Sequence, residues 1–316
     1  MRSRYAILSH LPAALIFGVV VAACADEAPE PEQPTDAAAA AETSEAAPDM
    51  ALENVGFATP ESVLHDPVAD VYLVSNINGA PVEADGNGFI SRLAPDGEVL
   101  DLKWIDGEAT GVTLNAPKGM AISRDHLFVA DIDCLRVFDL TTGEPLEEHC
   151  VEGATFLNDV AADGQGNVYF TDSGLDASFG PTGADAIYLL SGGAVMTVAS
   201  GEELGRPNGV AVVAGGLRIV TFGSGESYGV TPTGERTDVV AVAGSLDGVE
   251  MMADGSYLVS SWDEQSVIHI GADGTRESVV EDVEAPADIG FDRSRNRILI
   301  PLFNGNAVLF RALVGR

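Results

Sequence analysis

The sequence has few basic residues, few aromatic residues and almost no cysteine. Its 316 residues include 16 Lys and Arg against 49 Asp and Glu, which gives a formal net charge of −33. So acidic a chain repels nucleic acid, and we expect no nucleic-acid partner, whereas cations are attracted. The five His and three Cys form no cluster suited to structural zinc. The sequence has no dinucleotide fingerprint, and no long segment has helical periodicity.

The N-terminus has the pattern of an export signal. A basic start, MRSR, precedes the apolar run AALIFGVVVAA, which is too short to span a membrane comfortably. The run ends in VAAC (21–24), which resembles the bacterial lipobox and implies cleavage before Cys24 and lipidation of its thiol. Ala25 then favours the outer membrane over inner-membrane retention. The alternative is an ordinary secretory signal, and both place the mature protein outside the cytoplasm.

These features predict three segments. Residues 1–23 are the signal peptide, and residues 24–50 are an acidic Ala/Pro-rich tether that cannot build a core. Residues 51–316 form the globular domain. We expect an outer-membrane lipoprotein that faces the periplasm or the cell surface, touches the membrane only through its lipid anchor, and is a monomer. In such a compartment Cys134 and Cys150, which flank the turn signal LTTGEP, either form a disulfide or remain two buried thiols.

The globular part contains six copies of one short pattern. Each copy is Pro or Leu, any residue, usually Gly, and then an apolar residue. The copies are PESV (60–63), PKGM (117–120), LNDV (157–160), PNGV (207–210), LDGV (246–249) and PADI (286–289).

The copies recur about every 40 to 57 residues, and most begin a series of four short strands with turn residues between them. Such a period indicates the blades of a β-propeller. The last copy reaches the end of the chain after three strands, and a spare strand, LENVGFA (52–58), precedes the first copy. The sequence therefore predicts an all-β, six-bladed propeller whose ring is closed by an N-terminal strand.

The second residue of each copy falls where the innermost strand of a blade begins, near the central axis. In order these residues are Glu61, Lys118, Asn158, Asn208, Asp247 and Ala287. Two carboxylates and two amide carbonyls are hard oxygen donors, which suit Ca²⁺ or a similar divalent ion. We therefore predict a metal site on the axis.

At this point the sequence resembles the family of senescence marker protein, gluconolactonase and luciferin-regenerating enzyme, which are relatives of the paraoxonases. The resemblance is carried by ESVLHDPVADVYLVSNI (61–77), FLNDV (156–160), RPNGVAVV (206–213) and LDGVEMMADGSYLVS (246–260). It implies that Glu61, Asn158, Asn208 and Asp247 bind the ion, and that the protein hydrolyses a lactone or ester. The ion would polarise the carbonyl, and Asp247 would be both a ligand and a candidate general base.

Two residues depart from the family pattern. Phe156 stands where sugar-lactone members have an Arg, which favours a less polar lactone or ester. Lys118 is either an electrostatic catalyst or a cation that replaces the metal in an inert salt-bridge centre. Asp159, beside Asn158, is expected to be a turn residue; the alternative is a ligand of a further ion, as in the paraoxonases.

The substrate is expected above the ring. Two insertions, 78–88 and 174–185, would overhang it. The other loops between second and third strands supply Asp131, Asp133, Asp172, Phe222, Trp262 and Phe303. Phe156, Phe222 and Trp262 are the candidate substrate contacts, although aromatic residues more often serve blade packing. The rival function is a non-enzymatic propeller that binds a protein or envelope polymer, with a structural ion or a salt-bridge centre.

Overall fold

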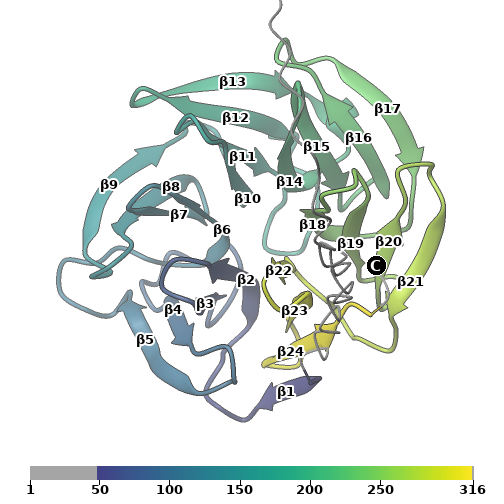
Figure 1. The fold of residues 1–316 in the computed structure, drawn as a ribbon. Coiled ribbons are helices and arrows are strands. Elements are labelled where there is room, and N and C mark those ends of the chain that lie inside the picture. The colour runs from purple at the N-terminus through teal and green to yellow at the C-terminus, as the bar shows by residue number, and fades with distance from the viewer. Residues whose placement is uncertain (1–47, 315–316) are drawn as a thin grey trace, which may run out of the picture. The chain divides into compact units, whose positions relative to one another are not determined.

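The computed structural model describes residues 48–314, which form the predicted six-bladed β-propeller (Figure 1). Its strands make six four-stranded antiparallel sheets, and the only helical segment in this range is a 3-10 turn, Glu202–Leu204. No helix among the described residues is long and apolar enough to cross a membrane. The expected signal peptide, Cys24 and nearly all of the tether lie outside the described residues.

Each blade runs outward from the axis in chain order. Blade 1 consists of β2 (Pro60–Asp66), β3 (Val71–Asn76), β4 (Phe89–Leu93) and β5 (Val99–Asp106). Blade 2 consists of β6 (Pro117–Ser123), β7 (His126–Asp131), β8 (Cys134–Asp139) and β9 (Pro145–Cys150). Blade 3 consists of β10 (Leu157–Ala162), β11 (Val168–Asp172), β12 (Ala186–Ser191) and β13 (Ala194–Ser200).

Blades 4 and 5 repeat this plan, and blade 6 combines the two ends of the domain. Blade 4 consists of β14 (Pro207–Val213), β15 (Gly216–Thr221), β16 (Glu226–Val230) and β17 (Arg236–Ala241). Blade 5 consists of β18 (Leu246–Met251), β19 (Tyr257–Ser261), β20 (Ser266–Ile270) and β21 (Arg276–Val280). Blade 6 consists of β22 (Gly290–Asp292), β23 (Arg297–Leu302), β24 (Ala307–Ala312) and β1 (Met50–Glu53).

The N-terminal strand closes the ring as predicted. β1 pairs antiparallel with β24, from Met50 opposite Phe310 to Glu53 opposite Ala307. The strand begins and ends earlier than the expected 52–58, because residues 54–59 turn inward to reach blade 1. Blades 1 and 6 are also joined by a buried hydrogen bond of 2.6 Å, which the Tyr72 hydroxyl donates to the Asp292 carboxylate.

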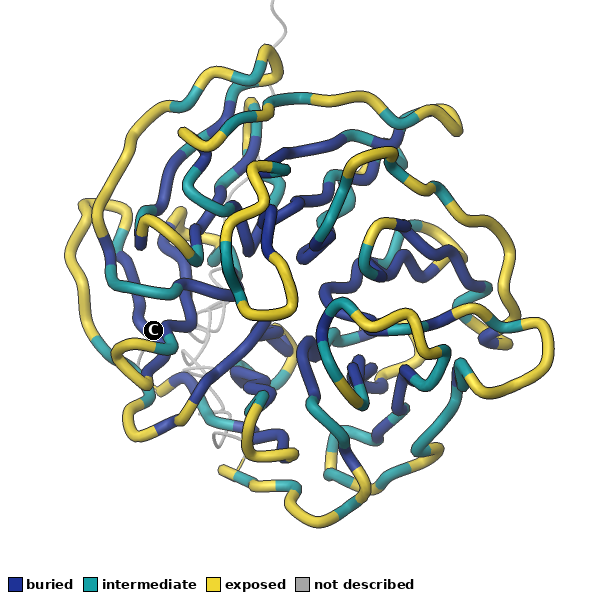
Figure 2. Tube along the Cα trace, turned by 180° about the vertical axis from the view of Figure 1, so that it is seen from behind, coloured by how far each residue is buried: buried dark blue, intermediate teal, exposed yellow. Residues whose placement is uncertain are grey.

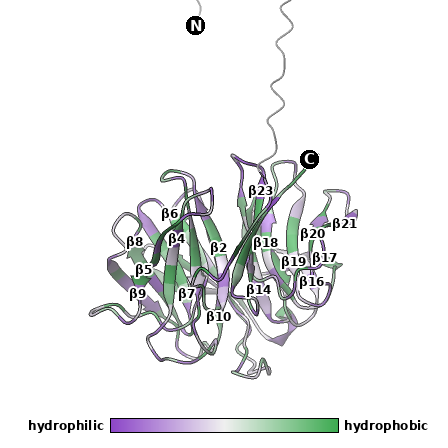
Figure 3. Cartoon of the chain, turned by 90° about the horizontal axis from the view of Figure 1, so that it is seen from below, coloured by the Kyte–Doolittle hydropathy of each residue, from purple (hydrophilic) through white to green (hydrophobic). Residues whose placement is uncertain are grey.

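The hydrophobic core is divided into six clusters, one between each pair of neighbouring blades. The cluster between blades 2 and 3, for example, contains Phe128, Val160 and Phe170. Inner strands are buried and outer strands are exposed, as the tube seen from behind displays (Figure 2). Hydrophobic and hydrophilic residues are interleaved along the strands (Figure 3). The middle strands, such as β3 and β19, are buried along their whole length, because both faces of a blade pack against neighbouring blades.

Cys134 and Cys150 form the disulfide that was one of the two alternatives. The two residues face each other in the register of β8 and β9, and their sulfur atoms are 2.00 Å apart. The bond fixes the outer strand of blade 2 to the rest of the blade.

A β-bulge at the start of the inner strand recurs in five blades. In blade 4, Pro207 pairs with Thr221 and Val210 with Ile219, so Asn208 and Gly209 together oppose one residue. The same register shift occurs in blades 1, 2, 3 and 5. A bulge bends the strand and redirects its side chains. Here the second residues of these five copies line a cavity at the upper end of the channel, where the inner strands begin. The third residues that carry a side chain, Ser62, Asp159 and Asp288, line a cavity at the lower end.

Glycine is required at the third position where neighbouring inner strands approach closely. A Cβ atom on Gly209 would lie 2.4 Å from the backbone oxygen of Asp247, and one on Gly248 would lie 2.4 Å from the backbone nitrogen of Ile289. Both contacts are with the next blade. The glycine of the repeat is therefore a consequence of six strands crowding one axis.

This crowding predicts a position-specific cost of adding one methyl group. Gly209→Ala should lower the free energy of unfolding by about 1–3 kcal/mol, because the backbone of blade 5 has to move. Gly164→Ala is the matched control, since no atom lies within 4 Å of its Cβ position; it should change stability by less than about 0.5 kcal/mol. Chemical denaturation of both variants measures the difference, and equal stabilities would contradict the close approach.

Candidate metal centre and its aromatic mouth

The four predicted ligands meet at the upper end of the channel. Glu61, Asn158, Asn208 and Asp247 are each less than 5% exposed, and all four line one cavity of about 20 Å³. Lys118 lines the same cavity, whereas Ala287 completes the ring without a polar group. The sequence repeat alone had placed these residues at one level of the axis.

Each of the four predicted ligands has one buried oxygen with no hydrogen-bond donor. The atoms are Glu61 Oε2, Asn158 Oδ1, Asn208 Oδ1 and Asp247 Oδ1. An unpaired buried acceptor costs about 1–3 kcal/mol, so such atoms are rare in folded proteins. Four of them, contributed by four blades to one cavity, form the donor set that an oxygen-binding cation requires.

Neighbouring groups orient two of these side chains. The Asn158 amide donates a hydrogen bond of 2.9 Å to the Ser173 hydroxyl, which donates in turn to the Pro207 carbonyl. The amide nitrogen is thereby used, and its oxygen is left for the cavity. Trp262 Nε1 donates a hydrogen bond of 2.8 Å to Asp247 Oδ2 and likewise leaves Oδ1 unpaired.

The two carboxyl groups of the ring resist ionisation when no cation is present. Burial raises the pKa of Glu61 well above its ordinary value, and repulsion from Asp247 and Asp288 raises it further. Burial and Asp288 also raise the pKa of Asp247, which the hydrogen bond from Trp262 partly offsets. A divalent cation would reverse this balance, because it favours the ionised form of both carboxylates.

The centre is built differently from a cluster of acidic or imidazole ligands. Among residues 48–314, no group of three or more His, Cys, Asp or Glu is placed to hold a metal ion. The candidate site depends on two carboxylates and two amide oxygens, a mixture that suits Ca²⁺ better than softer metals.

Lys118 is fully buried but is not bonded to the ring carboxylates. Its ammonium donates a hydrogen bond of 3.0 Å to the Ala116 carbonyl and lies 4.6 Å from the centre of the Phe156 ring. No ion pair of Lys118 is formed within the described part of the chain. Burial lowers its pKa to about 8, against the attraction of Glu61. This geometry gives no support to a salt-bridge centre.

Five aromatic rings surround the mouth of the ring cavity. The predicted contacts Phe156, Phe222 and Trp262 are all there, together with Phe303. The fifth, Phe179, lies on the insertion 174–185 and was missed by the sequence reasoning. Its one signal in the sequence was an aromatic residue at the centre of a loop whose other residues, apart from Leu175, are small or polar.

Asp131 and Asp172 are structural and do not line the pocket. Each is buried at the end of the second strand of its blade and accepts hydrogen bonds from the segment that leads to a ring residue. Asp131 accepts from the backbone of Asn115 and Ala116. Asp172 accepts from the backbone of residues 155 and 156 at 3.0 Å. These carboxylates fix the approach to Lys118 and Asn158.

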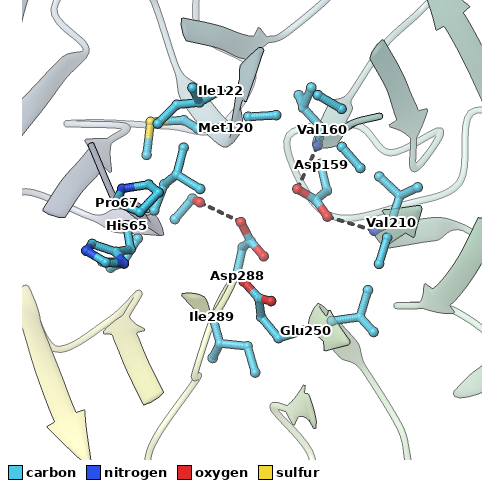
Figure 4. A pocket seen from close by; sticks show the side chains of 18 residues that line it. His65, Pro67, Met120, Ile122, Asp159, Val160, Val210, Glu250, Asp288 and Ile289 are labelled. Atoms are coloured by element: carbon cyan, nitrogen blue, oxygen red, sulfur yellow. Dashed lines mark hydrogen bonds between the residues drawn. The ribbon is translucent and has the colours of Figure 1, made fainter. Parts of the chain in front are cut away.

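A second cavity lies below the ring, at the lower end of the channel (Figure 4). Its volume is about 360 Å³, and apolar residues of the inner strands form most of its wall. Asp159 and Asp288 point into its upper part, where Asp288 accepts a hydrogen bond of 2.5 Å from the Ser62 hydroxyl.

The expectation that Asp159 is a turn residue was wrong. It lies in the bulge of β10, is 5% exposed, and accepts hydrogen bonds from the backbone of Val160 and Val210. Both carboxylate oxygens are therefore occupied by backbone donors, one of them from the next blade. Asp159 thus connects two inner strands at the axis.

Several solved structures have a similar fold. Luciferin-regenerating enzyme is 14% identical, with a TM-score of 0.61 over 84% of this chain and 96% of that chain. A gluconolactonase-family protein is 17% identical, with a TM-score of 0.60 over 83% and 91%. Virginiamycin B lyase from Staphylococcus aureus is 11% identical, with a TM-score of 0.60 over 84% and 99%.

At these identities the likeness establishes the fold, which proteins of different activity share. Two of the three belong to the family that the sequence resembles. No protein-family model and no curated protein matches the chain.

The unpaired oxygens predict that the ring binds Ca²⁺. Saturating Ca²⁺ at about 100 times Kd should stabilise the chelator-treated protein by roughly 2.7 kcal/mol. Asp247→Ala should abolish both the stabilisation and the calorimetric binding signal, whereas Glu152→Ala, at an exposed position, should retain them. Binding that survives Asp247→Ala would place the ion elsewhere.

The buried carboxylates predict that the ion-free protein loses stability as pH rises. Burial raises the pKa of Asp288 from 3.8 to about 7. Partial burial raises that of Glu250 above its ordinary value, although its side chain is 24% exposed and Arg293 opposes the shift. Because the pKa of each group is higher in the folded than in the unfolded protein, protonation stabilises the fold. This contribution to the free energy of unfolding is complete below about pH 4 and is lost as pH rises past 8. Asp292, whose pKa is lowered, changes the pH dependence of stability only at lower pH.

The measurement is the melting temperature in chelator at several pH values between 5.5 and 8. It should fall by at least about 3 °C over this range. Asp288→Asn should flatten the dependence. A constant melting temperature, or the same slope in Asp288→Asn, would contradict the assignment.

Proposed function

We propose that this protein is a hydrolase of a lactone or ester and that it depends on a divalent ion, Ca²⁺, held by Glu61, Asn158, Asn208 and Asp247. The observation that carries the proposal is the set of four unpaired oxygens that converge on one cavity. A purely structural centre would more simply be filled with apolar residues, as Ala287 fills the sixth position. The fold, shared with lactonase-like and lyase propellers, is compatible with this function.

When bound, a divalent ion polarises a carbonyl oxygen and orients the attacking water. Asp247 then has two tasks, since one oxygen faces the cavity and the other is held by Trp262. We infer that it accepts the proton of the attacking water, because of the two carboxylates in the cavity it is the one held in a fixed orientation by a hydrogen bond. Trp262 fixes the carboxylate in the orientation that this transfer needs.

Lys118 is positioned to stabilise negative charge. Its ammonium lines the same cavity and has a single carbonyl partner, so it has further N–H donors to offer a carbonyl oxygen that becomes an anion. Burial lowers its pKa to about 8 in the ion-free protein, and a divalent ion in the same cavity would lower it further. The ammonium should therefore lose its charge, and its contribution, at a lower pH than an ordinary lysine.

The mouth of the cavity favours an apolar substrate. Its lining beyond the ring is aromatic and aliphatic, and Phe156 is buried beside Lys118. A polyhydroxylated sugar lactone would leave its hydroxyls without partners there, at a cost of about 1–3 kcal/mol each. We therefore propose a lactone or ester with an apolar substituent.

The setting of this activity is also a proposal. The lipobox-like VAAC and the acidic tether support a lipid-anchored monomer on the outer membrane, with a small-molecule substrate and no nucleic-acid partner. The net charge of −33 would keep the globular part away from an anionic surface.

The proposed roles predict a specific pattern of losses in an ester and lactone hydrolysis assay. Asp247→Asn should remove activity, and Lys118→Met should lower kcat/KM by about 10²–10³. In the unsubstituted protein the rate should fall in alkaline solution as Lys118, whose pKa is lowered, loses its charge, and Lys118→Met should lack this alkaline limb. Lys103→Met, a partly exposed lysine paired with Glu108, is the control. Ca²⁺ binding without hydrolysis of any apolar lactone or ester would favour the binding-module function.

A further inference from the structure

Phe179 stands at the tip of a small hairpin that overhangs the ring. The hairpin lies between β11 and β12, where Leu175 pairs with Pro181 and the Gly174 carbonyl accepts a hydrogen bond of 2.7 Å from Thr182. The Asp176 carboxylate accepts from the backbone of residues 178 and 180, which closes the tip. Phe179 itself has φ of 58°, a conformation that costs free energy for any residue with a side chain.

The Phe179 ring fills the space above the candidate metal centre. It stacks on Phe222 at 6.0 Å between centroids, and it lies 6.1 Å from Phe156 and 6.4 Å from Trp262. The cavity left beneath these rings is about 20 Å³, close to the space one water needs. A cavity of this size has no room for an organic group while Phe179 occupies this place.

The walls of this space do not depend on Phe179. Phe222, Trp262 and Phe303 follow the second strands of three successive blades, and each backbone N–H donates to a carbonyl at 3.0–3.1 Å. Trp262 contacts both other rings, at 5.5 and 5.1 Å, and is bonded to Asp247. The site formed by these rings would therefore persist if the hairpin moved.

The hairpin is held more weakly than the walls. Residues 176–178 and 181–183 are exposed, and the Phe179 backbone N–H bonds only within the hairpin, to the Asp176 carbonyl. A side-chain hydrogen bond connects the hairpin to the segment before β10, between the hydroxyls of Thr182 and Thr155 at 2.9 Å. Leu175, at the foot of the hairpin, is buried, so the movable part is the tip beyond it, which is mostly exposed and closed by its own hydrogen bonds.

We propose that the Phe179 side chain occupies the subsite for a planar apolar group of the substrate, and that it leaves when the substrate binds. The space that it fills is walled by aromatic rings and is of phenyl size. The substrate class is accordingly a lactone or ester that carries an aromatic or similarly flat ring. That this space is a substrate subsite rests on the proposed function, whereas competition between Phe179 and an aromatic ligand does not.

The competition can be measured without any reaction. Trp104→Phe leaves Trp262 as the one tryptophan of the chain, and its fluorescence then reports binding beside it. In this background, benzyl alcohol is titrated into the full-length protein with Phe179 intact and into Phe179→Ala. If Phe179 fills the site in most molecules, only the remaining fraction can bind the probe, and the apparent affinity is reduced by that fraction. Phe179→Ala should therefore bind benzyl alcohol about tenfold more tightly.

Two further variants test whether Phe179 blocks the subsite or forms a permanent part of its wall. Phe222→Ala removes part of the wall and should lower the affinity for benzyl alcohol several-fold. Ser178→Ala, beside Phe179 at an exposed position, should leave the affinity unchanged. In hydrolysis assays Phe179→Ala should lower KM more for phenyl acetate than for ethyl acetate. Probe binding that is unchanged or weaker in Phe179→Ala would overturn the proposal, because Phe179 would then be a bystander or a permanent wall.

The outcome for the subsite is independent of the outcome for the hydrolase. Tighter probe binding in Phe179→Ala, in a protein that binds no Ca²⁺ and cleaves no ester, would support the aromatic subsite and contradict the proposed function. Ca²⁺-dependent hydrolysis together with weaker probe binding would support the function and contradict the subsite.

Discussion

The close approach of six inner strands around one axis is the constraint on which the rest of this structure depends. It forces a bulge into five of these strands, and it allows only glycine at Gly209 and Gly248. The bulge in turn separates two consecutive side chains, one toward the upper cavity and one toward the lower. Polar residues that a regular ladder would place on opposite faces of a blade are thereby gathered in the channel, away from the six hydrophobic cores between the blades.

Much of this arrangement could be predicted from the sequence, because it repeats. The six copies of one pattern gave the number of blades, and the second residue of each copy gave the ring of Glu61, Asn158, Asn208 and Asp247. What does not repeat was not predicted. Asp159 was expected to be a turn residue; the bulge of the inner strand is what places its side chain in the buried channel. Phe179 belongs to an insertion, for which no second copy exists to compare.

The channel carries more negative charge than the fold alone can stabilise. Glu61, Asp159, Asp247 and Asp288 are all buried along it, and burial raises the pKa of every one. Lys118 is the one fully buried amine beside them, and it bonds a backbone carbonyl. Protons on these carboxylates relieve their mutual repulsion, and the cation that we propose for the ring would relieve it as well. Binding of that cation would release protons, so its affinity would depend on pH.

The closing of the ring by β1 also has a consequence for how the chain folds. Met50 and its partners on β24 are separated by almost the whole domain, since the Arg311 side chain bonds the Met50 carbonyl across 261 residues. While the chain is being synthesised, the first strand therefore has an unpaired edge until its partner, the last strand, is available. Non-local pairings of this kind slow folding, and exposed edges invite aggregation. At four residues, β1 is short enough to limit that hazard while it lacks a partner.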